Sequence, residues 1–248
     1  MEREEDDASD AVWEGLAADG VVFELAARTQ SVTHAHDVFH LTLESGRTLE
    51  ADGMLVATGR TPNTRDLQTE RSGIECDERG FIRVNDYLQT TCPGIYAIGD
   101  VAKQPAFTHV SWEDYRRLSA TFAGKPRKRD DRVLSYSTFT EPQLARTGLT
   151  LAQAREKKID ARAQTLKLED VARATEWNLE RGFMRLVVDK ATDQIVGATL
   201  VGYEMGELVH TLALAIQLGA TWRDLDRLVA IHPTFGEGLP TLARLFEN

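Results

Sequence analysis

The sequence predicts a two-part architecture in which an α/β portion is followed by an α+β portion, with helices on an antiparallel sheet. Three patterns favour it. Short strand-like segments follow one another between residues 21 and 50, as in a β-meander. Residues 95–98 form a short apolar run between Pro-Gly and Gly-Asp, which is typical of a central strand. Apolar residues also recur at helical spacing over 205–216, and such a helix must bury one face.

The first expected element is a short amphipathic helix with Ser9 as its cap and an apolar face through Val12 and Leu16. Gly20 is its stop signal. Antiparallel strands are then predicted over residues 21–25, 27–33, 38–43 and 47–50. Ser45 and Gly46 form the clearest tight turn of this meander.

A buried strand is expected over residues 52–60, ending at Gly59, where the chain can bend close to another backbone or a ligand. Asp100 would stand at the carboxyl end of the strand at 95–98. In open α/β sheets ligands bind outside such ends, and a carboxylate there can accept hydrogen bonds from sugar or ribitol hydroxyls. The alternative is that Asp100 caps a helix that starts near Thr108.

The C-terminal portion carries its own helix and strand signals. Thr150 with Gln153 resembles a capping box, and Thr221 with Asp224 offers another cap. Residues 183–188 and 195–201 are predicted to be strands joined by a turn. The apolar stripe of the longest helix comprises Met205, Leu208, Val209, Leu212 and Ile216.

Composition and charge exclude several classes of protein. The 248 residues carry a formal net charge of -10, and their aromatic residues are not interleaved with Lys and Arg, which argues against a nucleic-acid partner. The acidic first residues predict neither a signal nor a transit peptide, and no segment approaches the length of a membrane span. Cys76 and Cys92 lie outside any Cys-x-x-Cys pattern, as in a reducing compartment, and a cytoplasmic location is expected.

The histidines at alternate positions of the meander are open to two interpretations. His34, His36 and His40 could form a metal-binding face, but a solvated strand edge is the favoured interpretation, and no metal site is predicted. His109 and His210 are assigned no catalytic role.

Motifs in order along the chain resemble the flavin-dependent pyridine nucleotide-disulfide oxidoreductases. "ATGRTPNT" (57–64) precedes "GIYAIGDV" (94–101). The dimerisation domain of that family is similar to "FTEPQLARTGLT" (139–150), "GFMRLVVD" (182–189), "IVGATLVG" (195–202) and "AIHPTFGE" (230–237). The stretch "FTHVSWEDYRRL" (107–118) looks closest to the mercuric-reductase-like and reactive-chlorine-resistance branch.

The resemblance implies a partial Rossmann-like domain for FAD and NAD(P)H, followed by the α+β dimerisation domain. It implies that Asp100 hydrogen-bonds the ribitol of FAD and that Gly99 lets the backbone approach the cofactor. Gly59 and Arg60 would lie where the chain crosses from the nicotinamide domain back into the FAD domain. The full set of implied cofactor-binding residues is Gly59, Arg60, Gly99, Asp100, Phe107 and Thr108.

His232 and Glu237 match the catalytic acid/base pair of the family. The resemblance implies that the imidazole serves the reactive thiol and flavin of the other subunit, while the carboxylate orients the ring. An imidazole titrates near neutral pH, so it suits proton transfer to and from a thiol. The alternative is a histidine that closes a turn before Pro233, with a glutamate that favours the first turn of the last helix.

The sequence also departs from a complete family member. It contains neither glycine-rich dinucleotide loop, no pair of redox cysteines four residues apart and no vicinal cysteines at its carboxyl end, so mercury specificity is not supported. The chain is therefore expected to be the carboxyl-terminal half of a longer flavoenzyme. The expected domains are a nicotinamide-domain remnant at 1–57, the second segment of the FAD domain at 58–130 and the dimerisation domain at 131–248.

The expected function is electron transfer from NAD(P)H through FAD and a thiol pair, missing here, to a disulfide, a quinone or a metal ion. A homodimer through residues 131–248 is expected, with no nucleic acid and no membrane span. The alternative is a stand-alone, non-catalytic module that keeps the dimerisation surface and binds a partner subunit.

Overall fold

The computed structural model describes Met1 and residues 3–247. The chain divides into two compact units, residues 1–21 with 131–248 and residues 22–130. The helices are α1 Asp6–Ala18, α2 Thr108–Phe122, α3 Leu151–Glu156, α4 Ala172–Trp177, α5 Met205–Gln217, α6 Trp222–Asp226 and α7 Gly238–Arg244. The strands are β1 Thr29–Ala35, β2 Val38–Leu43, β3 Thr48–Ala51, β4 Ser135–Ser137, β5 Gln143–Gly148, β6 Ala161–Lys167, β7 Phe183–Asp189 and β8 Ile195–Gly202.

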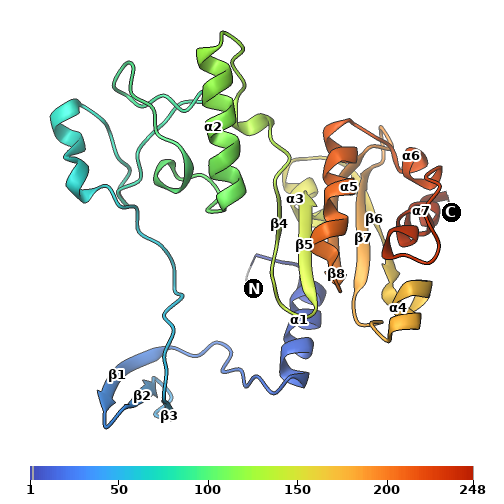
Figure 1. Cartoon of the computed structure of the whole chain (residues 1–248), viewed down its shortest axis with the longest axis horizontal. Coiled ribbons are helices and arrows are strands. Elements are labelled where there is room, and N and C mark those ends of the chain that lie inside the picture. The colour runs from blue at the N-terminus through green and yellow to red at the C-terminus, as the bar shows by residue number, and fades with distance from the viewer. Residues whose placement is uncertain (2, 248) are drawn as a thin grey trace. The chain divides into compact units, whose positions relative to one another are not determined.

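The first unit is built on an antiparallel sheet with the strand order β4-β5-β8-β7-β6. Alternate residues of a strand face opposite sides, so β7 directs Met184 and Leu186 to one core and Val187 to another. Helices α5 and α7 cover the first side (Figure 1). Helices α1 and α3 pack on the second side through Val12 and Ala154. The predicted α+β layer of helices on an antiparallel sheet is therefore confirmed.

Several local signals of this unit are also confirmed. Thr150 and Thr221 both form capping boxes, at the starts of α3 and α6. The strands predicted at 183–188 and 195–201 are β7 and β8. The predicted stripe of α5 faces the core through Met205, Val209 and Leu212.

Helix α1 differs from its prediction at its start. Its first residue is Asp6, so Ser9 lies inside the helix and does not cap it. The Ser9 hydroxyl donates to the Met1 carbonyl over 3.2 Å instead. Two acids in the first turn explain the earlier start, because Asp6 and Asp7 are stabilised by the positive end of the helix dipole.

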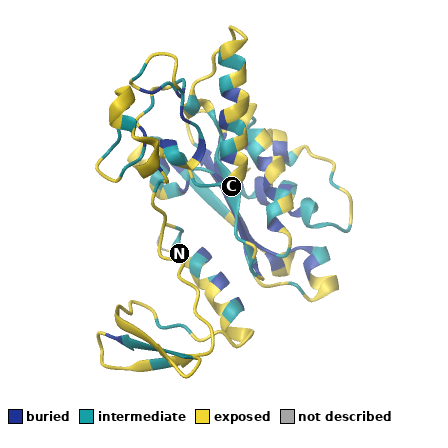
Figure 2. Cartoon of the chain, turned by 60° about the vertical axis from the view of Figure 1, so that its left-hand side comes forward, coloured by how far each residue is buried: buried dark blue, intermediate teal, exposed yellow. Residues whose placement is uncertain are grey.

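The second unit contains the meander β1-β2-β3 and helix α2. The turn at residues 45–46 is confirmed, since Gly46 N–H donates to the Leu43 carbonyl over 2.9 Å. The strand predicted at residues 21–25 is wrong: the segment joins no sheet, and Val22 is 81% exposed. Figure 2 shows the meander largely exposed, while buried residues concentrate in the sheet and helices of the first unit.

Two further predicted strands are also wrong. Strand β3 ends at Ala51, and residues 52–60 belong to no strand. Leu55 in this segment is 90% exposed. Residues 95–98 make only an isolated bridge between Tyr96 and Gln89. Both segments have the composition of buried strands, but among the described residues no neighbouring strand pairs with them in a ladder.

Candidate functional site

His232 and Glu237 are adjacent in the first unit. The Nδ1 atom of His232 lies 2.8 Å from Oε2 of Glu237, and the His232 side chain is 72% exposed while that of Glu237 is 19% exposed. A carboxylate only accepts hydrogen bonds, so Nδ1 carries the proton. In its neutral form such a ring keeps a lone pair on Nε2, and the hydrogen bond to the carboxylate fixes the ring orientation.

Local structure holds both members of this pair. Glu237 ends the short 3-10 turn Phe235–Glu237, directly before α7. His232 lies in the preceding loop, where the Thr234 hydroxyl donates to the Ile231 carbonyl over 2.7 Å. On the other side of the histidine, the Pro233 carbonyl accepts hydrogen bonds from Arg173 of α4.

The second unit contains a cavity of about 410 Å³ at the start of α2. It collects five of the six residues predicted to bind a cofactor, although they come from separate segments. The lining residues are Arg60, Ile98, Gly99, Asp100, Ala106, Phe107, Thr108 and Ser111. Gly59, the sixth predicted residue, does not line it.

Gly99 and Asp100 begin the 3-10 turn Gly99–Ala102, which replaces the predicted strand end. Asp100 is exposed at the cavity, and it does not cap α2, whose N-cap position is Phe107. The Gly99 N–H donates to Oδ2 of the buried Asp114 over 2.9 Å. The Gly99 amide is therefore held by α2, and the next residue, Asp100, lines the cavity.

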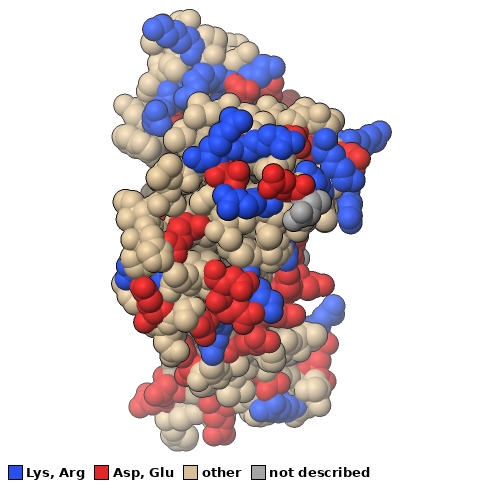
Figure 3. All heavy atoms as spheres, turned by 90° about the vertical axis from the view of Figure 1, so that its right-hand side faces the viewer, with Lys and Arg blue, Asp and Glu red and all other residues tan. Residues whose placement is uncertain are grey.

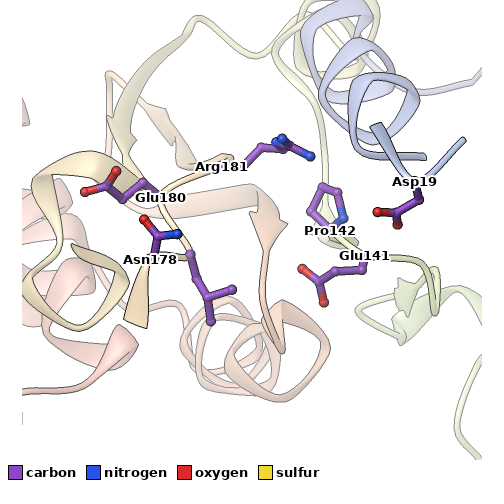
Figure 4. Close-up of a pocket in the computed structure, with 7 residues that line it drawn as sticks. Asp19, Glu141, Pro142, Asn178, Glu180 and Arg181 are labelled. Carbon is purple, nitrogen blue, oxygen red and sulfur yellow. The ribbon is translucent and has the colours of Figure 1, made fainter. Parts of the chain in front are cut away.

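A second hollow of about 350 Å³ lies in the first unit. Figure 4 shows Asp19 and Glu141 on one side and Asn178 and Glu180 on the other. Burial raises the pKa of the Glu141 carboxyl, and the charges of Asp19 and Glu204 add to the effect. No sequence motif pointed to this hollow.

Sequence reasoning missed two residues that hold these sites, Asp114 and Arg173. Asp114 lies within the α2 segment that resembles the family, and its spacing from Gly99 gave no signal of contact. Arg173 lies sixty residues before Pro233, and nothing local connects the two. Such contacts depend on tertiary packing.

The histidines of the meander contact residues of the meander itself. His40 pairs with Glu50 across β2 and β3 at 3.2 Å, while His34 contacts Phe39. Within the described part of the chain no three His, Cys, Asp or Glu side chains are grouped as metal ligands would be. Cys76 and Cys92 are free thiols.

Charge on the face that carries α6 and α7 is mixed. Arg223 pairs with Asp193 at 3.1 Å, and Arg244 pairs with Asp226 at 3.0 Å. Figure 3 shows basic and acidic side chains interspersed there. None of the helices in the described residues has the length and apolar character needed to cross a membrane.

Comparisons with known proteins agree with the geometry of both units. Residues 1–114 match the family model described as pyridine nucleotide-disulphide oxidoreductase, and residues 134–243 match the dimerisation domain of the same proteins. The chain belongs to the pyridine nucleotide-disulfide oxidoreductase family. The predicted fold class, a partial Rossmann-like domain followed by the dimerisation domain, is confirmed.

Curated relatives carry several names. The probable pyridine nucleotide-disulfide oxidoreductase RclA of Escherichia coli K12 is 33% identical over 99% of this chain and 56% of its own length. A dihydrolipoyl dehydrogenase of Vibrio cholerae is 32% identical, over 90% of this chain and 48% of its own. A glutathione reductase of Burkholderia cepacia is 30% identical, over 96% of this chain and 53% of its own length. The chain thus spans about half the length of the curated relatives it matches.

Solved structures show the same likeness. The HOCl-induced flavoprotein disulfide reductase RclA from Escherichia coli superposes with a TM-score of 0.91 at 32% identity, covering 99% of this chain and 57% of the other. LpdA from Mycobacterium tuberculosis gives a TM-score of 0.91 at 27% identity, and the match covers 98% of this chain and 53% of LpdA. The relatives therefore include a protein of the reactive-chlorine branch that the sequence predicted.

Proposed function

We propose that this chain supplies the second FAD-contacting segment and the dimerisation domain of an NAD(P)H-dependent disulfide oxidoreductase. The observation that carries the proposal is the pair of His232 and Glu237, joined at 2.8 Å with the imidazole exposed. Residues 1–57 would descend from the nicotinamide domain, 58–130 from the FAD domain and 131–248 from the dimerisation domain. Residues 1–21, which include α1, form one compact unit with residues 131–248. This packing fits a helix of the nicotinamide domain that rests on the dimerisation domain.

The dyad suits thiol chemistry. Nε2 of the neutral imidazole takes a proton from an attacking thiol, which makes the thiolate nucleophile. The resulting imidazolium is stabilised by the Glu237 carboxylate and later returns the proton to a leaving thiolate. In the homodimer that we propose, the imidazole of one subunit serves the thiol pair of the other. The acceptor would be a disulfide, a quinone or a metal ion.

The cavity at the start of α2 fits part of a flavin nucleotide. Asp100 is an exposed carboxylate at its rim and can accept hydrogen bonds from ribitol hydroxyls, while Thr108 adds a hydroxyl and the first turn of α2 adds its positive dipole end. Phe107 supplies apolar surface. When bound, FAD would supply the exchange of electrons between NAD(P)H and the thiol pair.

The cellular setting that we propose is the cytoplasm, in keeping with the free thiols of Cys76 and Cys92.

The proposal is tested on the native polypeptide, isolated from its source cells with Asp100→Asn or His232→Gln introduced at the gene. Flavin content is read from visible absorbance, and turnover is read as NAD(P)H-dependent disulfide reduction. His232→Gln should keep the flavin and lose about 100-fold or more in turnover, because it removes the proton carrier. Asp100→Asn should weaken flavin binding roughly 10- to 100-fold, because hydrogen bonds to a charged acceptor contribute about 1.5–3 kcal/mol.

His210→Gln is the matched control. His210 lies on α5, and its Nδ1 atom is 3.3 Å from the backbone carbonyl of Glu207 in the same helix. Its replacement should change neither readout. Unchanged turnover in His232→Gln would contradict the acid/base role, and a dimer without flavin or turnover would favour the non-catalytic module.

A further inference from the structure

The carbonyl of Pro233, the residue after the proposed acid/base histidine, is bound by a side chain from another element. Arg173 of α4 donates to it twice, from Nε over 3.0 Å and from Nη2 over 2.6 Å. The side chain of Arg173 is 23% exposed, so these charge-assisted bonds are partly shielded from water.

The guanidinium is itself held in place from the other side. It lies over the ring of Trp177, with its carbon 4.6 Å from the ring centroid, and Glu176 is 3.7 Å away. Trp177 in turn contacts Phe235, with ring centroids 6.3 Å apart and planes at 75°. Helix α4 therefore touches the segment on both sides of Thr234.

Besides Arg173, the Thr234 hydroxyl supports the histidine loop by donating to the Ile231 carbonyl over 2.7 Å. Among the described residues, no backbone-to-backbone hydrogen bond outside helices and strands reaches residues 229–232. The His232 ring is exposed and is hydrogen-bonded to Glu237. The direction of Nε2 therefore depends on how the nearby peptide units are held. Thr234 holds the unit before His232, and Arg173 holds the unit between Pro233 and Thr234.

We propose that Arg173 is a positioning residue for His232, which fixes the Pro233 peptide so that Nδ1 stays on Glu237 and Nε2 stays available to the reacting thiol. This inference rests on the proposed function for its biological meaning. The role requires arginine, because only the guanidinium fork directs two N–H groups of one plane at a single carbonyl while its face lies on an aromatic ring.

The test reads the geometry of the histidine without using turnover. The ¹⁵N chemical shifts of the His232 ring report which nitrogen carries the proton. In the wild-type chain the Nδ1–H form should predominate. In Arg173→Gln the loop loses both bonds, and the Nε2–H form should become populated to a similar extent. Arg173→Lys, which keeps a donor without the fork, should give an intermediate ratio.

Arg223→Gln is the matched control. Arg223 also lies on an aromatic ring, 4.1 Å from the centroid of Trp222, and pairs with Asp193 at 3.1 Å. Within the described part of the chain Arg223 makes no hydrogen bond or ion pair with the histidine loop, so its replacement should leave the His232 shifts unchanged. The ring of His210 serves as an internal marker of folding in every variant.

The wild-type tautomer ratio in Arg173→Gln would overturn the proposal. If that variant does not fold, the ratio in Arg173→Lys decides by the same criterion. In the native polypeptide, Arg173→Gln should also lower kcat roughly 10- to 100-fold, with flavin content unchanged, because small misplacements of a catalytic group are costly. If Arg173→Gln alters the His232 tautomer ratio while His232→Gln keeps normal turnover, the positioning role stands and the proposed function is rejected.

Discussion

Gly99 shows how one position can serve a fold and a site together. Its φ of +68° lies in the left-handed region, and a Cβ built there would be 2.7 Å from the Ser111 hydroxyl. The resemblance implied close approach of the backbone to a cofactor. The structure adds that α2 itself comes too close for a side chain. Packing against Ser111 and the backbone conformation thus both favour glycine at this position.

Gly99→Ala should therefore destabilise the chain more than alanine at a glycine with the same backbone and open space. Gly73 is that control, with φ +71° and nothing within 4 Å of the added Cβ. We expect roughly 1–2 kcal/mol for Gly73→Ala from the backbone alone, and about 1–3 kcal/mol more for Gly99→Ala from crowding against Ser111. Urea unfolding measures both. Equal losses would show that the Ser111 contact relaxes freely.

At the scale of elements, helix α1 is joined to the sheet by apolar packing and by charge. Ala8 and Val12 pack on Leu144 and Phe183. The acids at the helix start meet arginines of the sheet in three ion pairs, Glu4 with Arg146, Glu5 with Arg185 and Asp7 with Arg185. The positive end of the helix dipole and two guanidinium groups thus favour the same acidic segment.

The pair of Asp7 and Arg185 should make stability depend on pH. The hydrogen bond from Arg185 lowers the pKa of Asp7 in the folded chain. The stabilisation is present above the ordinary carboxyl pKa of about 4 and is lost as the pH falls through the lower folded value. Asp7→Asn should therefore reduce the free energy of unfolding at pH 7, and the difference from wild type should disappear at strongly acidic pH.

Asp10→Asn is the control for this experiment, because Asp10 is an exposed acid on the same helix. Urea unfolding at low salt, from neutral to acidic pH, compares the two variants. The prediction fails if Asp7→Asn and Asp10→Asn follow the same curve, or if the loss in Asp7→Asn grows as the pH falls.

At the scale of the whole molecule, large apolar side chains remain exposed in the region that matches the dimerisation domain. Leu218 is 75% exposed and Val229 is 94% exposed, although α5 and α6 beside them bury their other faces. If these positions lie in a dimer interface, a glutamate introduced at either one would lose the water around its carboxylate when the dimer forms, which costs free energy. The proposed homodimer gives these residues a partner surface.

Leu218→Glu and Val229→Glu should therefore weaken self-association without unfolding the chain. Val22→Glu is the control, because Val22 is also highly exposed but lies outside the matched dimerisation domain. Sedimentation equilibrium over a range of concentrations gives the dissociation constants, and a rise of at least tenfold is expected for the first two variants alone. The same constant in all three variants would exclude these residues from the interface.

Elements with short-range signals were the ones that the sequence could predict. The stripe of α5, the capping boxes at Thr150 and Thr221, and strands β7 and β8 follow from spacing and local hydrogen bonds. The pairing of His232 with Glu237 was also expected, through the family resemblance, and the structure places the two side chains in contact. Its catalytic role stays a prediction.

By itself, the sequence determined the helices α3, α5 and α6, the strands β7 and β8, and the family that the chain resembles. Only the tertiary structure decided that residues 52–60 and 95–98 are not strands, because a strand exists only where a neighbour accepts and donates its backbone hydrogen bonds. It also decided that Asp114 holds Gly99 and that Arg173 holds Pro233. Those contacts join residues distant in sequence, and their energy depends on packing that no local pattern records.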